Sequence, residues 1–220
     1  MAARPRIGLI HATPVAIEPI RASFAAAWPD TELANLLDDS LTPDRAKVGE
    51  ITPALTDRIV TLARYARAIG SHAILFTCSS FGSAIEQVAG LLDVPVLKPN
   101  EAMFEAAIAT GGRLAMIATF QPAKASMEAE FSEQARRMGS SATLTTFVVE
   151  PAMAALRRGD AEAHHGLVAK QAQELTGFDA IVLAHFSTAP AAAKVRAAVS
   201  VPVFTSPDAA VAKLHRLLGP

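Results

Sequence analysis

The chain has 220 residues, of which 51% are hydrophobic, 19% are charged and only 5% are aromatic. This composition indicates a well-buried globular protein whose core is built from alanine, valine, isoleucine and leucine. A formal net charge of −1 gives no electrostatic footprint for nucleic acid, which would need a clustered basic face to neutralise its phosphates, and anionic membrane surfaces are equally disfavoured partners. The length fits one large domain or two small ones.

Three further features of the sequence indicate the cellular compartment in which we expect the protein. No apolar run reaches the roughly 18–20 residues of a membrane-spanning helix. The N-terminus enters a strand without the apolar region and cleavage site of a signal peptide, so we expect a cytoplasmic protein with no membrane partner. The only cysteine, Cys78, cannot form an internal disulfide. It is either a small buried apolar residue or a reactive thiol in a reducing compartment.

Short apolar runs alternate with helical patterns through the first half of the chain. We expect strands at 6–11, 31–37, 73–77 and 94–97. We expect helices at 14–28, 56–69, 81–92 and 100–110. Thr56 or Asp57 caps the second of these helices, Gly70 closes it, and Asn100 caps the last. The segment 38–43 reads as a polar loop.

The same alternation begins again after Gly111 and Gly112. Strands are expected at 114–119, 143–149, 180–184 and 201–204. Helices are expected at 122–138, 151–158, 160–175, 188–198 and 208–218.

A repeat at a fixed offset of 107 residues relates the two halves. It aligns 7–12 with 114–119, 73–78 with 180–185, and 94–97 with 201–204. We therefore expect two similar lobes, 1–111 and 112–220, with the C-terminal helix free to pack on the first lobe. The repeat places His185 at the position of Cys78.

Alternating strands and helices predict an α/β fold with parallel sheets covered on both faces. Each pseudo-symmetric lobe would hold a mostly four-stranded parallel sheet flanked by helices. Ligands of such sheets bind beyond the carboxyl ends of the strands, so we expect an active-site cleft between the lobes.

The polar residues at these strand ends are the candidate site. Cys78 and His185 are its chemical pair, and His11, Thr13, Thr77, Ser79, Ser80, Thr119 and Ser187 are the candidate substrate contacts. Hydroxyls and the N–H groups of helix N-termini suit a small carboxylate. The positive end of a helix favours a thiolate and a neutral imidazole.

The repeated halves, the turn Thr77-Cys78-Ser79-Ser80 and the opening segment 7–14 resemble the aspartate/glutamate racemase superfamily. That group also holds hydantoin racemases, maleate isomerases and arylmalonate decarboxylases. The resemblance implies that a cysteine at the end of the equivalent strand in each lobe moves a proton at the carbon alpha to a carboxylate. It also implies a homodimer and, for Thr119, contact with the substrate carboxylate.

Three departures from the family pattern stand out. His185 replaces the second cysteine, Ser79 replaces a common asparagine, and Ala118 replaces the glycine before Thr119. Histidine can still donate or accept a proton. The first hypothesis is therefore a racemase or isomerase of a small carboxylate that needs no cofactor, since the chain has no glycine-rich phosphate loop.

Two alternatives remain open. One is a decarboxylase or other lyase in which Cys78 is the sole proton donor. The other is a protein of this fold that binds a small ligand without turnover, because fold alone does not determine function. The adjacent His164 and His165 lack the spaced partners of a metal site, and no metal is expected.

Overall fold

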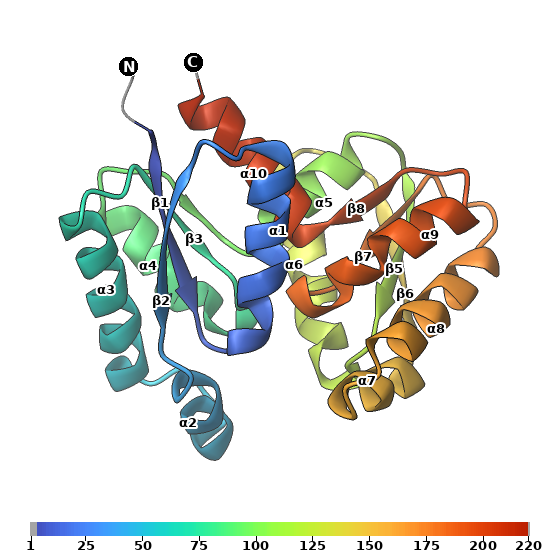
Figure 1. Cartoon of the computed structure of the whole chain (residues 1–220), viewed down its shortest axis with the longest axis horizontal. Coiled ribbons are helices and arrows are strands. Elements are labelled where there is room, and N and C mark those ends of the chain that lie inside the picture. Colours follow the sequence, from blue (N-terminus) through green and yellow to red (C-terminus); the bar gives the residue numbers. More distant parts are fainter. Residues whose placement is uncertain (1–3, 220) are drawn as a thin grey trace. The chain divides into compact units, whose positions relative to one another are not determined.

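The computed structural model describes residues 4–219 (Figure 1). The chain forms two compact units. One holds the residues up to Pro99 together with those from Ala210 onward, and the other holds Asn100–Ala209. The expected boundary near Gly111 lies beyond this division, and the C-terminal helix begins in the second unit and ends in the first.

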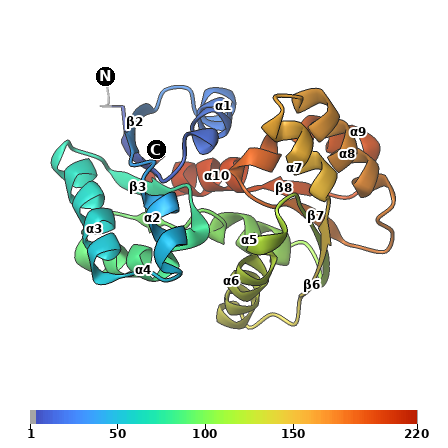
Figure 2. The same ribbon diagram turned by 90° about the horizontal axis from the view of Figure 1, so that it is seen from below.

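The first unit contains a four-stranded parallel sheet of order β2-β1-β3-β4. Its core on one face joins strand residues such as Ile10 and Phe76 to Ile59, Ala63 and Ile85 of the covering helices. Figures 1 and 2 show α3 and α4 on that side of the sheet and α1 on the other. The elements are β1 (Arg6–His11), η1 (Pro14–Ala16), α1 (Ile17–Ala27), β2 (Glu32–Leu37), α2 (Leu41–Val48), α3 (Pro53–Ala68), β3 (Ala73–Phe76), η2 (Ser79–Phe81), α4 (Gly82–Leu91) and β4 (Val96–Leu97), where η denotes a short 3₁₀ helix.

The second unit repeats this plan with a parallel sheet of order β6-β5-β7-β8. Met103 and Phe131 of α5 and α6 pack on one face, and Ala152, Val168 and Val195 of α7, α8 and α9 pack on the other. The elements are α5 (Glu101–Ile108), β5 (Arg113–Ala118), η3 (Gln121–Ala123), α6 (Lys124–Arg137), β6 (Thr143–Val148), α7 (Glu150–Arg157), α8 (Ala161–Gln173), β7 (Ala180–Leu183), η4 (Phe186–Ala191), α9 (Ala192–Ala198), β8 (Val203–Thr205) and α10 (Ser206–Leu218).

Strand register confirms the predicted repeat. Ile7 pairs with Ala73 in the first sheet and Leu114 pairs with Ala180 in the second, which is an offset of 107 on both strands. The outer strands β2 and β6 instead differ by 111, because Arg6 pairs with Glu32 and Arg113 with Thr143. Helix α6 has 14 residues and α1 has 11, which accounts for most of the difference.

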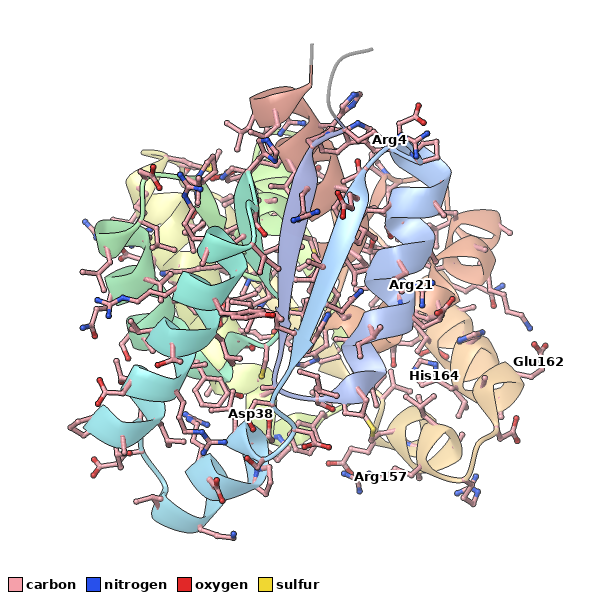
Figure 3. The ribbon with its side chains drawn as sticks, turned by 60° about the vertical axis from the view of Figure 1, so that its left-hand side comes forward. Arg4, Arg21, Asp38, Arg157, Glu162 and His164 are labelled. Carbon is pink, nitrogen blue, oxygen red and sulfur yellow. The ribbon has the colours of Figure 1, made fainter. Side chains whose placement is uncertain are left out.

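The prediction of a polar loop over 38–43 was only partly right, because helix α2 begins inside that segment, at Leu41. Leu41 of this helix is fully buried, and Arg58 of α3 forms ion pairs with Asp38 at 2.6 Å and with Asp44 at 2.8 Å. Figure 3 shows Asp38 where β2 ends. Tertiary contacts therefore stabilise a helix whose sequence lacks an apolar stripe.

Two predicted caps are also corrected. Helix α3 begins at Pro53, with the Thr52 hydroxyl accepting from the Leu55 N–H, so Thr56 lies inside the helix. Asn100 precedes α5 without capping it, because its amide donates to Glu130 and its carbonyl oxygen accepts from Ser206. None of the helices within 4–219 is long and apolar enough to cross a membrane.

Candidate functional site

The carboxyl end of β3 carries the only thiol of the chain. Thr77 is buried, and Cys78, Ser79 and Ser80 are partly exposed as the chain turns into η2. Cys78 is extended, with φ of −126° and ψ of 120°, and its side chain packs against the core beneath α3 and α4. Because the turn adjoins that core, Cys78 at the end of this buried strand is only partly exposed to solvent.

His11 ends β1 beside Thr77. It is completely buried, and its Nδ1 lies 2.9 Å from the Thr77 hydroxyl, while its Nε2 lies 3.0 Å from Oδ1 of Asn35 on β2. Burial lowers the pKa of His11, an effect that the hydrogen bond to Asn35 opposes. Both ring nitrogens are therefore bonded within the first unit.

Thr13 lies in the next turn, at the N-cap position of η1, and is partly exposed. Neither its hydroxyl there nor the side chain of Cys78 before η2 caps the short helix that follows. Thr13 therefore does not cap η1.

In the second unit the matching strand ends carry Thr119 and His185. Thr119 is buried, and its hydroxyl lies 3.5 Å from that of Thr188, which is also buried. Ser187 lies between His185 and Thr188 in the sequence and is partly exposed within η4. Thr188 and Asn35 are polar partners that the sequence analysis missed. The signal for Asn35 was an amide among the otherwise apolar residues 33–37 of β2.

The backbone of His185 is unusual. Its φ is 68° and its ψ is 155°, and it is the only non-glycine residue with a positive φ between residues 4 and 219. Residues other than glycine rarely adopt a positive φ of this kind. Such backbone strain is often found at functional sites. His185 and Cys78 therefore occupy matching register positions with different backbone conformations.

The ring of His185 is neutral at neutral pH. Its side chain is partly exposed, yet enough protein surrounds the ring that desolvation lowers its pKa to about 4. A hydrogen bond from the ring to the backbone of Ala184 acts in the opposite direction. The Ala184 N–H already donates to Ile117, so the ring N–H donates to the Ala184 carbonyl. The other ring nitrogen keeps a lone pair that can accept a proton.

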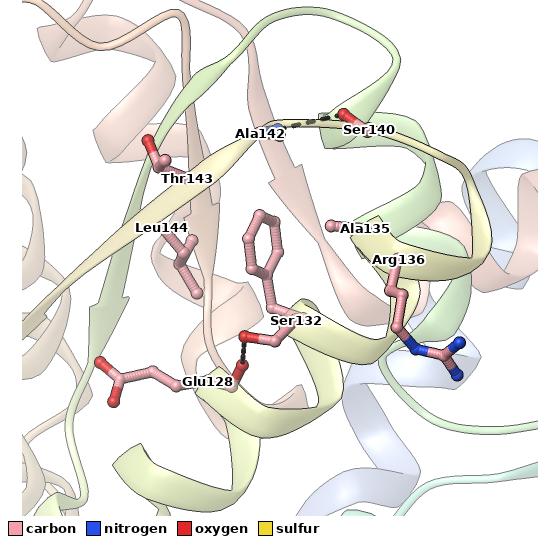
Figure 4. Close-up of a pocket in the computed structure, with 9 residues that line it drawn as sticks. Glu128, Ser132, Ala135, Arg136, Ser140, Ala142, Thr143 and Leu144 are labelled. Carbon is pink, nitrogen blue, oxygen red and sulfur yellow. Dashed lines mark hydrogen bonds between the residues drawn. The ribbon is translucent and has the colours of Figure 1, made fainter.

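A groove of the second unit lies away from these strand ends. It encloses about 530 Å³ between α6 and the start of β6, and Glu128, Ser132, Arg136 and Thr143 line it (Figure 4). This is the amino end of β6, opposite to the strand ends that carry Thr119 and His185. No three His, Cys, Asp or Glu side chains of the described residues gather into a candidate metal site.

Solved structures with the same architecture include racemases and a decarboxylase. Allantoin racemase from Klebsiella pneumoniae superposes with a TM-score of 0.72 at 19% identity, over 97% of this chain and 87% of that one. An aspartate racemase from Picrophilus torridus gives 0.68 at 15% identity, over 98% and 94%. A mutant of arylmalonate decarboxylase gives 0.69 at 20% identity, again over 98% and 94%.

These likenesses establish the fold, and a family model extends them. No curated protein sequence matches the chain significantly. The model described as Asp/Glu/hydantoin racemase matches residues 7–175, which include β1 to β6 and the turn at Cys78 but end before His185. The chain therefore belongs to the Asp/Glu/hydantoin racemase family.

Proposed function

We propose that the protein is a racemase or isomerase that moves a proton at the alpha carbon of a small carboxylate, with Cys78 and His185 as the opposing acid and base. One observation supports this most directly: matching strand ends in the two sheets carry a thiol and a neutral imidazole at the same register position. A two-base reaction requires such a pair, one group to remove the proton and one to replace it.

The neutral imidazole of His185 suggests a direction for the first step. Neutral His185 removes the alpha proton on its unbonded ring nitrogen, and the electron pair of the C–H bond moves into the carboxylate to give an enediolate. The Cys78 thiol then protonates the opposite face, which leaves a thiolate and an imidazolium. The reverse reaction, or exchange with water, restores both groups. No oxidant, reductant or cofactor is needed.

Stabilising the enediolate is the larger demand, because an imidazole with so low a pKa is a weak base. Preorganised hydrogen-bond donors supply such stabilisation in other enzymes. We assign this role to the hydroxyls of Thr13, Ser79, Ser80, Thr119 and Ser187. His11 and Thr77 are assigned a supporting role in the first unit, because the ring of His11 is fully bonded.

The second candidate is a decarboxylase in which Cys78 alone protonates the enediolate left by loss of carbon dioxide. The single cysteine of the chain favours it, because one proton donor suffices for that reaction. Such an enzyme would release carbon dioxide from substituted malonates and would form one product enantiomer.

The test is proton NMR in deuterium oxide with separate enantiomers of amino acids and hydantoins, with maleate, and with substituted malonates. We expect Cys78→Ala and His185→Ala each to lower the rate of inversion by about 10²-fold or more. Cys78→Ala should still exchange the alpha proton of the enantiomer that presents it to His185, without inverting it.

Each other outcome has its own reading. Release of carbon dioxide that depends on Cys78 and not on His185 identifies the decarboxylase. Saturable binding with no deuterium uptake identifies a binding protein. Inversion that survives at the wild-type rate in both alanine variants rules out the Cys78 and His185 pair.

A further inference from the structure

Three polar side chains cross the first sheet at its carboxyl end. Asn35 projects from β2, His11 from β1, and Thr77 from the residue after β3. The two ring nitrogens of His11 join them, with contacts of 3.0 Å to Asn35 and 2.9 Å to Thr77. We call these three residues the relay. It ends at the residue that precedes Cys78.

The hydrogen bonds of the relay have a defined direction. Oδ1 of Asn35 is an acceptor, so the proton of the neutral ring lies on Nε2. Nδ1 then accepts from the Thr77 hydroxyl, whose other acceptor, the carbonyl of Ile10, is more distant at 3.4 Å. The Thr77 N–H also donates to Ile10 at 3.0 Å. Side chain and backbone together hold Thr77 against β1.

The second unit shows that the fold does not require the relay. The 107-residue offset places Ala118 at the position of His11 and Ala184 at that of Thr77. Asn35 pairs with Leu9 and Thr146 pairs with Met116, so Thr146 is the counterpart of Asn35. Its hydroxyl is buried and has no hydrogen-bond partner among the residues described. The second sheet thus forms with alanine at the positions of His11 and Thr77. The relay occurs only in the unit that carries the thiol.

We propose that His11 is a positioning residue: held by Asn35, it fixes Thr77 and through it the backbone of Cys78. The proposal rests on the proposed function in one respect, that Cys78 is the reacting thiol. It adds a reason for a buried histidine whose two ring nitrogens are both bonded within the first sheet. The contact it depends on is the one between Nδ1 and Thr77, while the contact to Asn35 orients the ring.

Two pairs of substitutions separate positioning from packing. An asparagine side chain at position 11 reaches about as far as Nδ1 and can still accept from Thr77. A glutamine reaches about as far as Nε2, so His11→Gln keeps the bond to Asn35 and loses Thr77. In the same way Thr77→Ser keeps the hydroxyl and Thr77→Val removes it. Thr146→Val is the matched control, a hydroxyl removed from the counterpart position of the second sheet.

The first measurement does not need a substrate. Because Cys78 is the only cysteine, its alkylation by iodoacetamide reports the opening of this turn alone. We expect His11→Gln and Thr77→Val to alkylate about fivefold faster, since each loses a buried hydrogen bond that keeps the turn closed. The alkylation rates of His11→Asn and Thr77→Ser should lie closer to the wild-type rate than those of His11→Gln and Thr77→Val. Thr146→Val should alkylate at the wild-type rate.

The second measurement uses any substrate that turns over. His11→Gln and Thr77→Val should lower kcat about tenfold with little change in KM, because a displaced reacting group loses alignment and not affinity. The proposal is overturned if His11→Asn and His11→Gln behave alike, or if all four relay variants alkylate at the wild-type rate. If His11→Gln does not fold, the Thr77 pair decides. If no substrate turns over, the proposed function fails while alkylation still tests the positioning role.

Discussion

At the scale of single residues, the main difference between the two strand ends is backbone conformation. Cys78 is extended, whereas His185 has the positive φ that favours glycine. Such a conformation in a residue with a side chain stores roughly 1–3 kcal/mol and persists only where the surroundings impose it. Phe186 and Thr188, one and three residues after His185, are buried and anchor the segment. The strain therefore belongs to the position of His185 and not to its ring.

This predicts opposite effects of glycine at the two positions. His185→Gly should be more stable than His185→Ala by about 1 kcal/mol, because glycine relieves the strain. Cys78→Gly should be less stable than Cys78→Ala, because extended backbone there gives glycine no advantage. Urea unfolding of the four variants measures both differences. If the alanine variant is more stable than the glycine variant at both positions, the backbone of His185 is not strained.

The sequence predicted which residues end the strands, but not how they are held. The repeat alone paired Cys78 with His185, because side chains at strand ends follow directly from strand register. The hydrogen bonds of His11 depend on Asn35, 24 residues away, and periodicity does not report partners across strands. The positive φ of His185 is set by packing of η4 and has no local sequence signal such as a glycine.

At the scale of elements, equal register does not mean equal helix packing. Gly8 of β1 and Ala115 of β5 occupy the same position. A Cβ added to Gly8 would lie 2.9 Å from Cβ of Ala66 on α3 and 3.0 Å from Oγ of Ser71. Ala115 carries its Cβ in a fully buried position of the second sheet. Helix α3 thus approaches β1 more closely than a side chain at Gly8 would allow.

We therefore predict that Gly8→Ala destabilises the protein by about 1–3 kcal/mol, as overpacking of a buried contact does. Adding Ala66→Gly should recover part of that loss, although glycine inside a helix itself costs about 1 kcal/mol. A double-mutant cycle from urea unfolding measures the coupling between the two positions. Additive effects would mean that Ala66 is not the obstacle.

Most elements were predictable, and the exceptions have physical causes. Helices with a buried apolar stripe, such as α3, were found from their periodicity. Helix α2 was missed because Arg58, a residue of another helix, holds its start through Asp38 and Asp44. The four-residue shift of β6 relative to β2 was missed because helix length can change without changing the pattern of either strand.

At the scale of the whole chain, neutral histidines link folding to pH. Burial lowers the pKa of His11, His164, His165 and His185. The unfolded chain binds protons at these sites from about pH 6.5 downward while the folded chain does not, so stability falls as the pH falls. For His185 the loss runs from about pH 6.5 to its folded pKa of about 4 and reaches at most about 3 kcal/mol.

His164 is the most sensitive test of this linkage. It is completely buried on α8 (Figure 3) in line with Val168 and Ala172, and neither ring nitrogen has a hydrogen-bond partner in the part of the chain that the structure describes. Desolvation and the neighbouring His165 both lower its pKa. Leucine at this position would continue the apolar stripe and would leave no unbonded polar group.

His164→Leu should therefore stabilise the protein at pH 8 by about 1 kcal/mol, the scale of an unsatisfied buried polar group, and by more at pH 5. The gain grows on acidification because only the wild-type unfolded chain takes up a proton at this site. Urea unfolding at both pH values measures it, with Lys170→Leu on the exposed side of the same helix as the control. That control should change stability by no more than about 0.5 kcal/mol and equally at both pH values. A gain from His164→Leu that does not depend on pH would mean that His164 is protonated to the same extent in the folded and unfolded chains.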